Sequence, residues 1–358
     1  MMNEVHGADI YTAAEKLGTD KNNILDFSSN INPLGIPESV KQACINAIYH
    51  SNKYPDINSR ELINSISKEE KVLESWIFPS NGAAEAIFRI TFSLRPKKGL
   101  VTAPAFSEYE SALKAVNAGL NYYNLKEENN FQIQNDILNC IDLETNIIFL
   151  CNPNNPTGQL TNKETLENII KYCRQLNVFV VIDECFLDFI ENKEEFSTVN
   201  LLNTYNNLII LKAFTKIYAI PGIRLGYCMS SNEHLIETLK ISGSPWNVSN
   251  IAQAAGIAAL KEKDYVKESV AYINQERKYL NDELNKLNIK TYESHANYIL
   301  FKIHDKIDLK EEMLKKNILI RSCSNYNNLC NDYYRIAVKT RKENKQFLKT
   351  LKEIIGRQ

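Results

Sequence analysis

Four polar residues follow short apolar segments in the middle of the chain, and their types suit contact with a bound ligand. They are Asn155, Asp183, Lys216 and Arg224. In open α/β sheets, ligands bind at the carboxyl ends of the strands, so residues placed there are candidates for one shared site. An amide, a carboxylate, an amine and a guanidinium would together make that site polar and reactive.

A predicted helix start upstream adds a place for an anion. The residues Asn81-Gly82-Ala83-Ala84-Glu85 introduce this helix. The first N–H groups of a helix lack partners within it, and they carry the positive end of the helix dipole. The amides of Ala83 and Ala84 are therefore candidates for holding a phosphate.

The elements that must position these residues alternate between strand and helix. Apolar segments rich in β-branched residues predict strands at 99–103, 146–151, 178–182 and 208–211. A helix is expected over 107–117, and another runs to about residue 176 from Thr161, which has Glu164 at the capping-box spacing. Such strands separated by amphipathic helices predict a mainly parallel sheet covered on both faces, an α/β core.

After about residue 255 the pattern changes to a smaller α+β unit. A long charged helix is expected at 263–287 and a short one at 309–315, ahead of a closing helix. Strands are expected, in chain order, at 289–292, 297–301, 318–321 and 333–338. This order predicts a mostly antiparallel sheet. We therefore expect an N-terminal arm over 1–40, a large domain over 41–255 and a small C-terminal domain over 256–358.

Composition restricts the partners of the protein. The 42 basic and 43 acidic residues of its 358 give a net charge of -1, which predicts neither nucleic acid nor a membrane as partner. The longest apolar runs are far shorter than a membrane span, and the N-terminus lacks the pattern of a signal peptide. The eight cysteines form no C-x-x-C pair. We therefore expect no metal site and a location in the reducing cytoplasm.

Taken together, the motifs resemble those of the fold-type I pyridoxal phosphate enzymes, the aspartate aminotransferase superfamily. The resemblance rests on the N-P-N-N-P-T-G turn at 152–158, the strand ending at Asp183, the Thr215-Lys216 pair and the Gly-x-Arg-x-Gly at 222–226. Each piece alone has an ordinary interpretation as a turn, a helix cap or a surface charge. Their order and spacing carry the resemblance, which implies a three-layer α/β fold and pyridoxal 5'-phosphate as cofactor.

The resemblance also implies roles for individual residues. Lys216 would form a Schiff base with the cofactor aldehyde, and Asp183 would keep the pyridine nitrogen protonated. Asn155 would donate a hydrogen bond to the phenolic oxygen of the ring, and Tyr109 would stack on the ring. The remaining implied cofactor contacts are Ala83, Ala84, Thr215, Arg224 and Tyr54. Tyr54 would reach the cofactor phosphate of a neighbouring subunit, which implies a homodimer.

Two branches of the superfamily are close, the histidinol-phosphate aminotransferases and the threonine-phosphate decarboxylases. Four stretches are similar to the decarboxylases: 6–11, 26–35, 183–189 and 318–326 with 333–335. In the third of these, Phe186 replaces the tyrosine of the aminotransferases. The substrate contacts implied by this resemblance are His6, Gly7, Asn30, Asn155, Arg321 and Arg335. Two arginines and a histidine suit a substrate with a carboxylate and a phosphate.

The expected reaction is therefore decarboxylation of O-phospho-L-threonine, with Lys216 returning a proton to Cα. Two departures from the decarboxylase pattern affect this expectation. Ala213 stands where relatives often have a phosphate-binding hydroxyl, and Ala8-Asp9 adds a negative charge near the expected anion pocket. Phosphoserine is therefore an alternative substrate. Histidinol-phosphate transamination is a different reaction that the same motifs allow. A catalytically silent protein on this fold is a third hypothesis, although retention of Lys216 and Asp183 argues against it.

Overall fold

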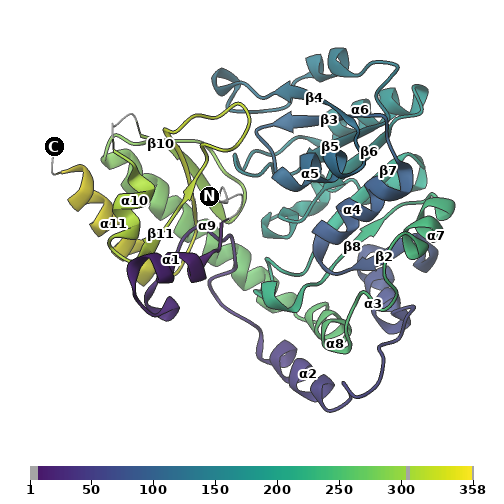
Figure 1. The fold of residues 1–358 in the computed structure, drawn as a ribbon, viewed down its shortest axis with the longest axis horizontal. Coiled ribbons are helices and arrows are strands. Elements are labelled where there is room, and N and C mark those ends of the chain that lie inside the picture. The colour runs from purple at the N-terminus through teal and green to yellow at the C-terminus, as the bar shows by residue number, and fades with distance from the viewer. Residues whose placement is uncertain (1–6, 304–306, 357–358) are drawn as a thin grey trace.

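A seven-stranded sheet forms the centre of the larger part of the molecule (Figure 1). This computed structural model describes residues 7–303 and 307–356. The strand order is β2-β8-β7-β6-β5-β3-β4, and β8 alone runs antiparallel to its neighbours. The strands are β2 (Ile77–Ser80), β3 (Lys98–Ala103), β4 (Gly119–Asn124), β5 (Ile147–Cys151), β6 (Phe179–Asp183), β7 (Leu208–Ala213) and β8 (Gly226–Met229).

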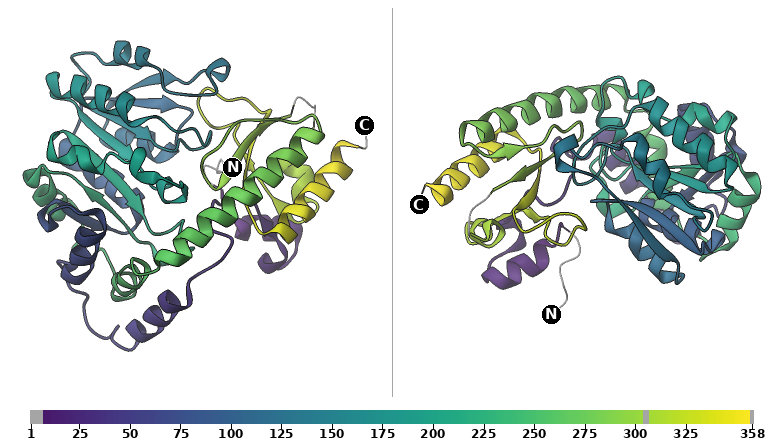
Figure 2. Two further views of the ribbon diagram at one scale, coloured as in Figure 1. Left: turned by 180° about the vertical axis from the view of Figure 1, so that it is seen from behind. Right: turned by 90° about the horizontal axis from the view of Figure 1, so that it is seen from above.

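Helices cover both faces of this sheet. They are α3 (Arg60–Glu70), α4 (Gly82–Leu94), α5 (Ser107–Ala115), α6 (Lys163–Gln175) and α7 (Glu233–Ile241), whereas α2 (Glu38–Ile48) packs on α8 (Asn250–Ala259) beside the sheet. The chain crosses the sheet in opposite directions through α5 and α6, so right-handed crossovers place these helices on opposite faces. The views from the front and from behind show this three-layer arrangement (Figures 1 and 2). The predicted fold class is thus confirmed.

A second, four-stranded antiparallel sheet lies in the C-terminal part, in the order β12-β13-β10-β9. Its strands are β9 (Lys290–Thr291), β10 (Tyr298–Lys302), β12 (Arg321–Ser322) and β13 (Tyr333–Ala337). The helices of this part are α9 (Lys263–Lys286), α10 (Leu309–Leu314) and α11 (Arg341–Ile355). Figure 2 shows α9 extending from the large sheet along the C-terminal unit. The exact domain boundaries remain a prediction.

The N-terminal arm packs against this C-terminal unit. Helix α1 (Ile10–Leu17) buries Ala13 and Ala14 against Leu314 and Leu319. Strand β1 (Leu25–Asp26) pairs in parallel with β11 (Ile318–Leu319). The amide of Ala337 donates to the carbonyl of Phe27, whose ring lies 5.0 Å from that of Phe347. The arm therefore reaches the candidate site from the side of the C-terminal sheet.

Some predicted details are wrong. Helix α6 begins after Asn162, whose side chain accepts from the amide of Thr165, and Thr161 is not the cap. The reason is that both backbone groups of Thr161 are bonded to the side chain of Asn152. The predicted strand 318–321 is divided into β11 and β12, which belong to different sheets. Strands β2, β4 and β8 were not predicted. No helix within the described ranges is long and apolar enough to cross a membrane.

Candidate active site

The carboxyl ends of neighbouring strands bring the predicted reactive residues together. Asp183 is the last residue of β6, which lies between β5 and β7. In the pairing register Asp183 lies opposite Cys151 on one side and Leu211 on the other. Asn155 lies in the turn after β5, and Lys216 lies in the turn after β7. Three side chains far apart in the sequence thus lie together at the carboxyl ends of the central strands.

Lys216 lies in a half-buried position that lowers the pKa of its side-chain amine. Burial and the nearby positive charges of Arg335 and Arg224 lower the pKa of its amine to about 8. Its Nζ lies 5.9 Å from the centre of the Phe186 ring. Within the described ranges its Nζ has no hydrogen bond or ion pair. A neutral amine is therefore accessible near neutral pH, as attack on an aldehyde requires.

Asp183 is a buried carboxylate with two hydrogen-bond donors. Its Oδ2 accepts from the Tyr109 hydroxyl at 2.7 Å, and its Oδ1 accepts from the Cys185 amide at 2.9 Å. Burial raises the pKa of Asp183, and these two donors oppose the rise. The Tyr109 ring is fully buried and stacks on Phe149 at 5.1 Å. The structure thus places Tyr109 as the partner of Asp183, and its stacking on a cofactor stays a prediction.

The start of α4 forms a cradle for an anion. Gly82 has a φ of +76°, and a Cβ there would lie 2.6 Å from Nη2 of Arg224. A Cβ on Gly226 would lie 2.7 Å from the amide nitrogen of Ala83. Both glycines therefore allow the first turn of α4, with Ala83 and Ala84, to approach an arginine and a strand closely. The side chain of Asn81 does not cap this helix in the described structure, so backbone amides stay available.

Two further cofactor candidates, Thr215 and Tyr54, differ in exposure. Thr215 is buried directly before Lys216 in the turn that follows β7. Tyr54, between α2 and α3, is 80% exposed. Its ring packs on Trp246 with centroids 4.7 Å apart, which is its ring contact within the described residues. The structure does not bring Tyr54 to the other candidates within one chain.

Arg335 is a buried cation on the C-terminal side of the site. Its Nη1 donates to Oδ1 of Asn155, and its Nη2 donates to the carbonyl of Ser28 at 2.8 Å. The Tyr298 ring lies 5.5 Å from its guanidinium. Its Nε is buried with no partner, and no carboxylate pairs with it within 7–303 and 307–356. A buried charge surrounded by neutral groups is costly, so this guanidinium is set up to receive an anion.

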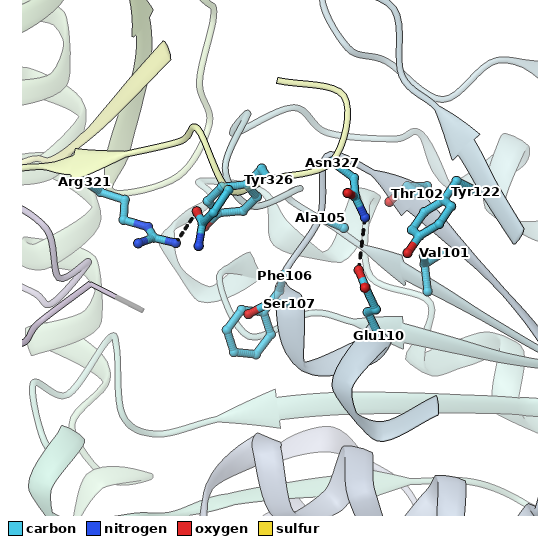
Figure 3. A pocket seen from close by; sticks show the side chains of 11 residues that line it. Val101, Thr102, Ala105, Phe106, Ser107, Glu110, Tyr122, Arg321, Tyr326 and Asn327 are labelled. Atoms are coloured by element: carbon cyan, nitrogen blue, oxygen red, sulfur yellow. Dashed lines mark hydrogen bonds between the residues drawn. The ribbon is translucent and has the colours of Figure 1, made fainter. Parts of the chain in front are cut away.

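Arg321 lies on the neighbouring strand and lines a pocket with Phe106, Ser107 and Asn327 (Figure 3). Its Nη2 donates to Oδ1 of Asn325 at 2.8 Å. The Tyr326 ring lies 5.3 Å from the Arg321 guanidinium, and its hydroxyl accepts from Nη1 of Arg335 at 3.5 Å. Tyr326 therefore stands between the two arginines. The structure brings both arginines to one side of the site.

The N-terminal arm supplies the remaining predicted contacts. A Cβ on Gly7 would lie 2.6 Å from the carbonyl oxygen of Ser28, so Gly7 packs closely beside the residue that holds Arg335. Asn30 is buried, and its Oδ1 has no hydrogen-bond partner among the described residues. An orphaned buried acceptor fits a ligand that donates to it. His6 lies outside the described residues.

Two residues that contact Arg335 in the site, Tyr298 and Ser28, were not predicted from the sequence. Tyr298 lies under Arg335, contacts Phe186 with ring centroids 5.1 Å apart and donates to the carbonyl of Asn154 at 2.8 Å. It stands in an apolar segment whose pattern indicates only a strand. Ser28 contributes its backbone carbonyl, which no side-chain pattern could have revealed.

Comparison with known proteins identifies the family. The family model described as aminotransferase class I and II matches residues 22–351. The chain belongs to this family. Threonine-phosphate decarboxylase of Salmonella typhimurium is 34% identical to this chain over 99% of it and 98% of the relative. Histidinol-phosphate aminotransferase of Methanosphaera stadtmanae is 32% identical over 96% of this chain and 93% of the relative.

Solved structures agree with this assignment. The crystal structure of the histidinol-phosphate aminotransferase from Clostridium acetobutylicum is similar with a TM-score of 0.87 and 36% identity. The match covers 94% of this chain and 100% of that one. The protein is therefore a pyridoxal phosphate-dependent enzyme of the aminotransferase family. Both branches expected from the sequence are represented among its relatives at similar identity.

The residues present fit pyridoxal phosphate. The chain offers an amine of lowered pKa at Lys216, a buried acceptor at Asp183 and a glycine-lined anion cradle beside Arg224. These three groups match the aldehyde, the ring nitrogen and the phosphate of the cofactor. The individual contacts are proposals that follow from this match.

Proposed function

We propose that this enzyme decarboxylates O-phospho-L-threonine to (R)-1-amino-2-propanol O-2-phosphate and carbon dioxide for cobalamin biosynthesis. The observation that carries the proposal is the pair of arginines separated by Tyr326, one of them a buried cation whose partners among the described residues are neutral. A substrate with a carboxylate and a phosphate presents two anions to such a pair. The similarity to threonine-phosphate decarboxylase over nearly the whole chain supports it.

Geometry favours one assignment of the two anions. Arg335 is hydrogen-bonded to Asn155, which lies with Lys216 and Asp183 at the carboxyl ends of the central strands. The carboxylate of phosphothreonine is one bond from Cα, whereas the phosphorus is three bonds from it. We therefore assign the carboxylate to Arg335 and the phosphate to Arg321, on the far side of Tyr326. The Oδ1 of Asn30, which has no partner among the described residues, would accept from a donor of the ligand.

The reaction needs one leaving group and one proton. When bound, the cofactor supplies an electron sink for the bond broken at Cα. The substrate carboxylate leaves as carbon dioxide, and its electron pair stays at Cα. The Lys216 ammonium then gives a proton to Cα and regains one from water, which completes the phosphorylated amino alcohol. A lysine with a pKa of about 8 exchanges protons readily near neutral pH.

Phe186 bears on the choice between decarboxylation and transamination. It lies beside Lys216 and Tyr298 and has no hydroxyl to offer the cofactor ring.

Histidinol-phosphate transamination is the second candidate, and the 36% identity to the Clostridium acetobutylicum aminotransferase favours it. Phosphoserine decarboxylation is a variant of the first candidate that differs by one methyl group on the substrate.

The working form would be a cytoplasmic homodimer. Tyr54 is exposed in the single chain, next to Trp246, as expected of a residue that reaches the cofactor phosphate of a partner subunit. The eight cysteines are all free thiols, which suits a reducing compartment. Sedimentation of the holoenzyme, with Tyr54→Ala compared for cofactor retention, tests this arrangement.

The decisive experiment compares three substrates on the same holoenzyme. Carbon dioxide release from phosphothreonine, with formation of the phosphorylated amino alcohol, is the expected result. Phosphoserine in a parallel reaction measures the preference for the methyl group. Turnover of histidinol phosphate with 2-oxoglutarate, without carbon dioxide release from phosphothreonine, would reverse the choice of branch.

A further inference from the structure

A short stretch of the N-terminal arm, Ser28 to Asn32, is bonded to both sides of the candidate site. At one end, the Ser28 carbonyl accepts from Nη2 of Arg335 at 2.8 Å. At the other end, the backbone amide of Asn32 donates to the carbonyl of Lys216 at 3.2 Å. Arm residues only four positions apart therefore touch the proposed carboxylate-binding arginine and the turn of the proposed reactive lysine.

The side chain of Asn32 adds to this connection. Its Nδ2 donates to the carbonyl of Ile217 at 2.7 Å and to Oγ of Ser269 on α9 at 2.7 Å. Its Oδ1 accepts from the amide of Leu34 at 3.1 Å. Asn32 is 2% exposed and Ile217 is 1% exposed. A buried carbonyl that loses its donor is destabilised, so the Ile217 carbonyl depends on this amide.

The amine of Lys216 is not held by polar contacts with the described residues. Its Nζ makes no hydrogen bond or ion pair with the described residues, and it lies over the face of Phe186. The location of the amine is therefore determined by the backbone of the turn and by packing. The pKa of about 8 also depends on this location, because burial is its main cause.

We propose that Asn32 is a positioning residue for Lys216, holding the lysine turn at a fixed place between the N-terminal arm and α9. The inference rests on the proposed role of Lys216 in binding the cofactor. A displacement of about 1 Å at a reacting group reduces a rate by up to about a hundredfold. Asn32 therefore determines how fast the amine reacts, without touching the cofactor.

Cofactor attachment to the apoprotein tests this inference without measuring turnover. Pyridoxal phosphate is added at a series of pH values, the complex is trapped with borohydride, and the peptide carrying Lys216 is quantified by mass spectrometry. Asn32→Ala should attach cofactor about tenfold more slowly than wild type. Its pH midpoint should move upward from about 8 toward the ordinary lysine value of 10.5, because a loosened turn admits water to the amine.

Two further variants separate positioning from stability. Asn22→Ala removes the same amide from an exposed position of the same arm and should behave as wild type. Ser269→Ala removes only the hydrogen bond between Asn32 and α9 and should slow cofactor attachment about threefold. If Asn32→Ala does not fold, the attachment rate of Ser269→Ala tests the inference in its place. Thermal unfolding of each apoprotein is measured in parallel.

The outcomes distinguish this inference from the proposed function. An Asn32→Ala protein with a lower unfolding temperature but with the wild-type rate and pH midpoint would overturn the inference. So would equal attachment by all four proteins. If wild-type protein carries the trapped cofactor on a lysine other than Lys216, the proposed site assignment fails first and the inference fails with it.

Discussion

The hydroxyl of Tyr109 donates a hydrogen bond of 2.7 Å to Oδ2 of Asp183. The two residues come from α5 and β6 and are both buried. Tyr109 therefore contributes more than an aromatic ring, because it supports the charge of the carboxylate that is proposed to hold the cofactor nitrogen.

Replacing Tyr109 with phenylalanine should weaken cofactor binding. The pKa of Asp183, already raised by burial, should rise further when one of its donors is lost, so less of the carboxylate is ionised. We expect the dissociation constant of pyridoxal phosphate to increase about tenfold, measured by equilibrium dialysis. Tyr205→Phe is the matched control, because Tyr205 is also a buried tyrosine whose hydroxyl donates to a carboxylate, that of Glu167 on α6. Equal dissociation constants for the two variants would contradict the prediction.

Covalent attachment of the cofactor should follow the titration of Lys216. The neutral amine is the reactive form, and it predominates above its pKa of about 8. The attachment rate should therefore be greatest above pH 8 and fall about tenfold per pH unit below it, as for a single proton. Rapid-mixing absorbance measurements give the profile, and Lys216→Ala should abolish it. A midpoint near 10.5 in wild type would show that the amine is not buried in solution.

The two arginines should respond differently to a ligand without a carboxylate. Arg335→Leu should weaken binding of phosphothreonine about a hundredfold and leave binding of 1-amino-2-propanol phosphate nearly unchanged. Arg321→Leu should weaken binding of both, because both carry the phosphate. Calorimetric titration of wild type and both variants with each ligand gives the six constants needed. The opposite pattern would exchange the roles assigned to the arginines.

Glu127 should contribute to holding the C-terminal sheet against the large one. Burial opposes its ionisation, but hydrogen bonds from Lys290, Tyr292, Tyr333 and Lys302 outweigh this and hold its pKa well below the usual range. Glu127→Gln should therefore destabilise the protein by about 1–2 kcal/mol at pH 7.

The pH dependence of this effect has a definite sign. A depressed carboxyl pKa stabilises the folded state above the unfolded value of 4.5, and that contribution decreases as the pH falls below it. Denaturant unfolding at pH 7 and at pH 3.5 should show a smaller difference between wild type and Glu127→Gln at the lower pH. Glu128→Gln, at an exposed neighbouring position, should differ from wild type at neither pH.

The central sheet could be predicted from the sequence because its buried strands are continuous apolar segments. Asp183 ends one such strand and Lys216 lies in the turn after the next, so the topology brings them to the same end of the sheet. Strand β8 was missed because it has four residues and begins with Gly226. Strand β2 was missed because Pro79 interrupts its pattern.

The other half of the site could not be predicted because it depends on contacts between distant segments. Asn32 and Ile217 are 185 positions apart, and the bond uses a backbone carbonyl that has no signature in the sequence. The Ser28 carbonyl, bonded to Arg335 across 307 positions, presents the same difficulty. Resemblance to a family indicated the arginines, but only the three-dimensional packing revealed Tyr326 between them.

The parallel pairing of β1 with β11 has a consequence for biosynthesis. Leu25 lies opposite Ile318, so two segments separated by 293 positions form one structure. Residues 318 and 319 must therefore be synthesised before this pairing can form, whereas all strands of the large sheet lie before residue 230 and can assemble earlier. The N-terminal arm therefore has no partner strand while the large sheet forms, and the side of the site that contains Arg321 and Arg335 is completed after that sheet.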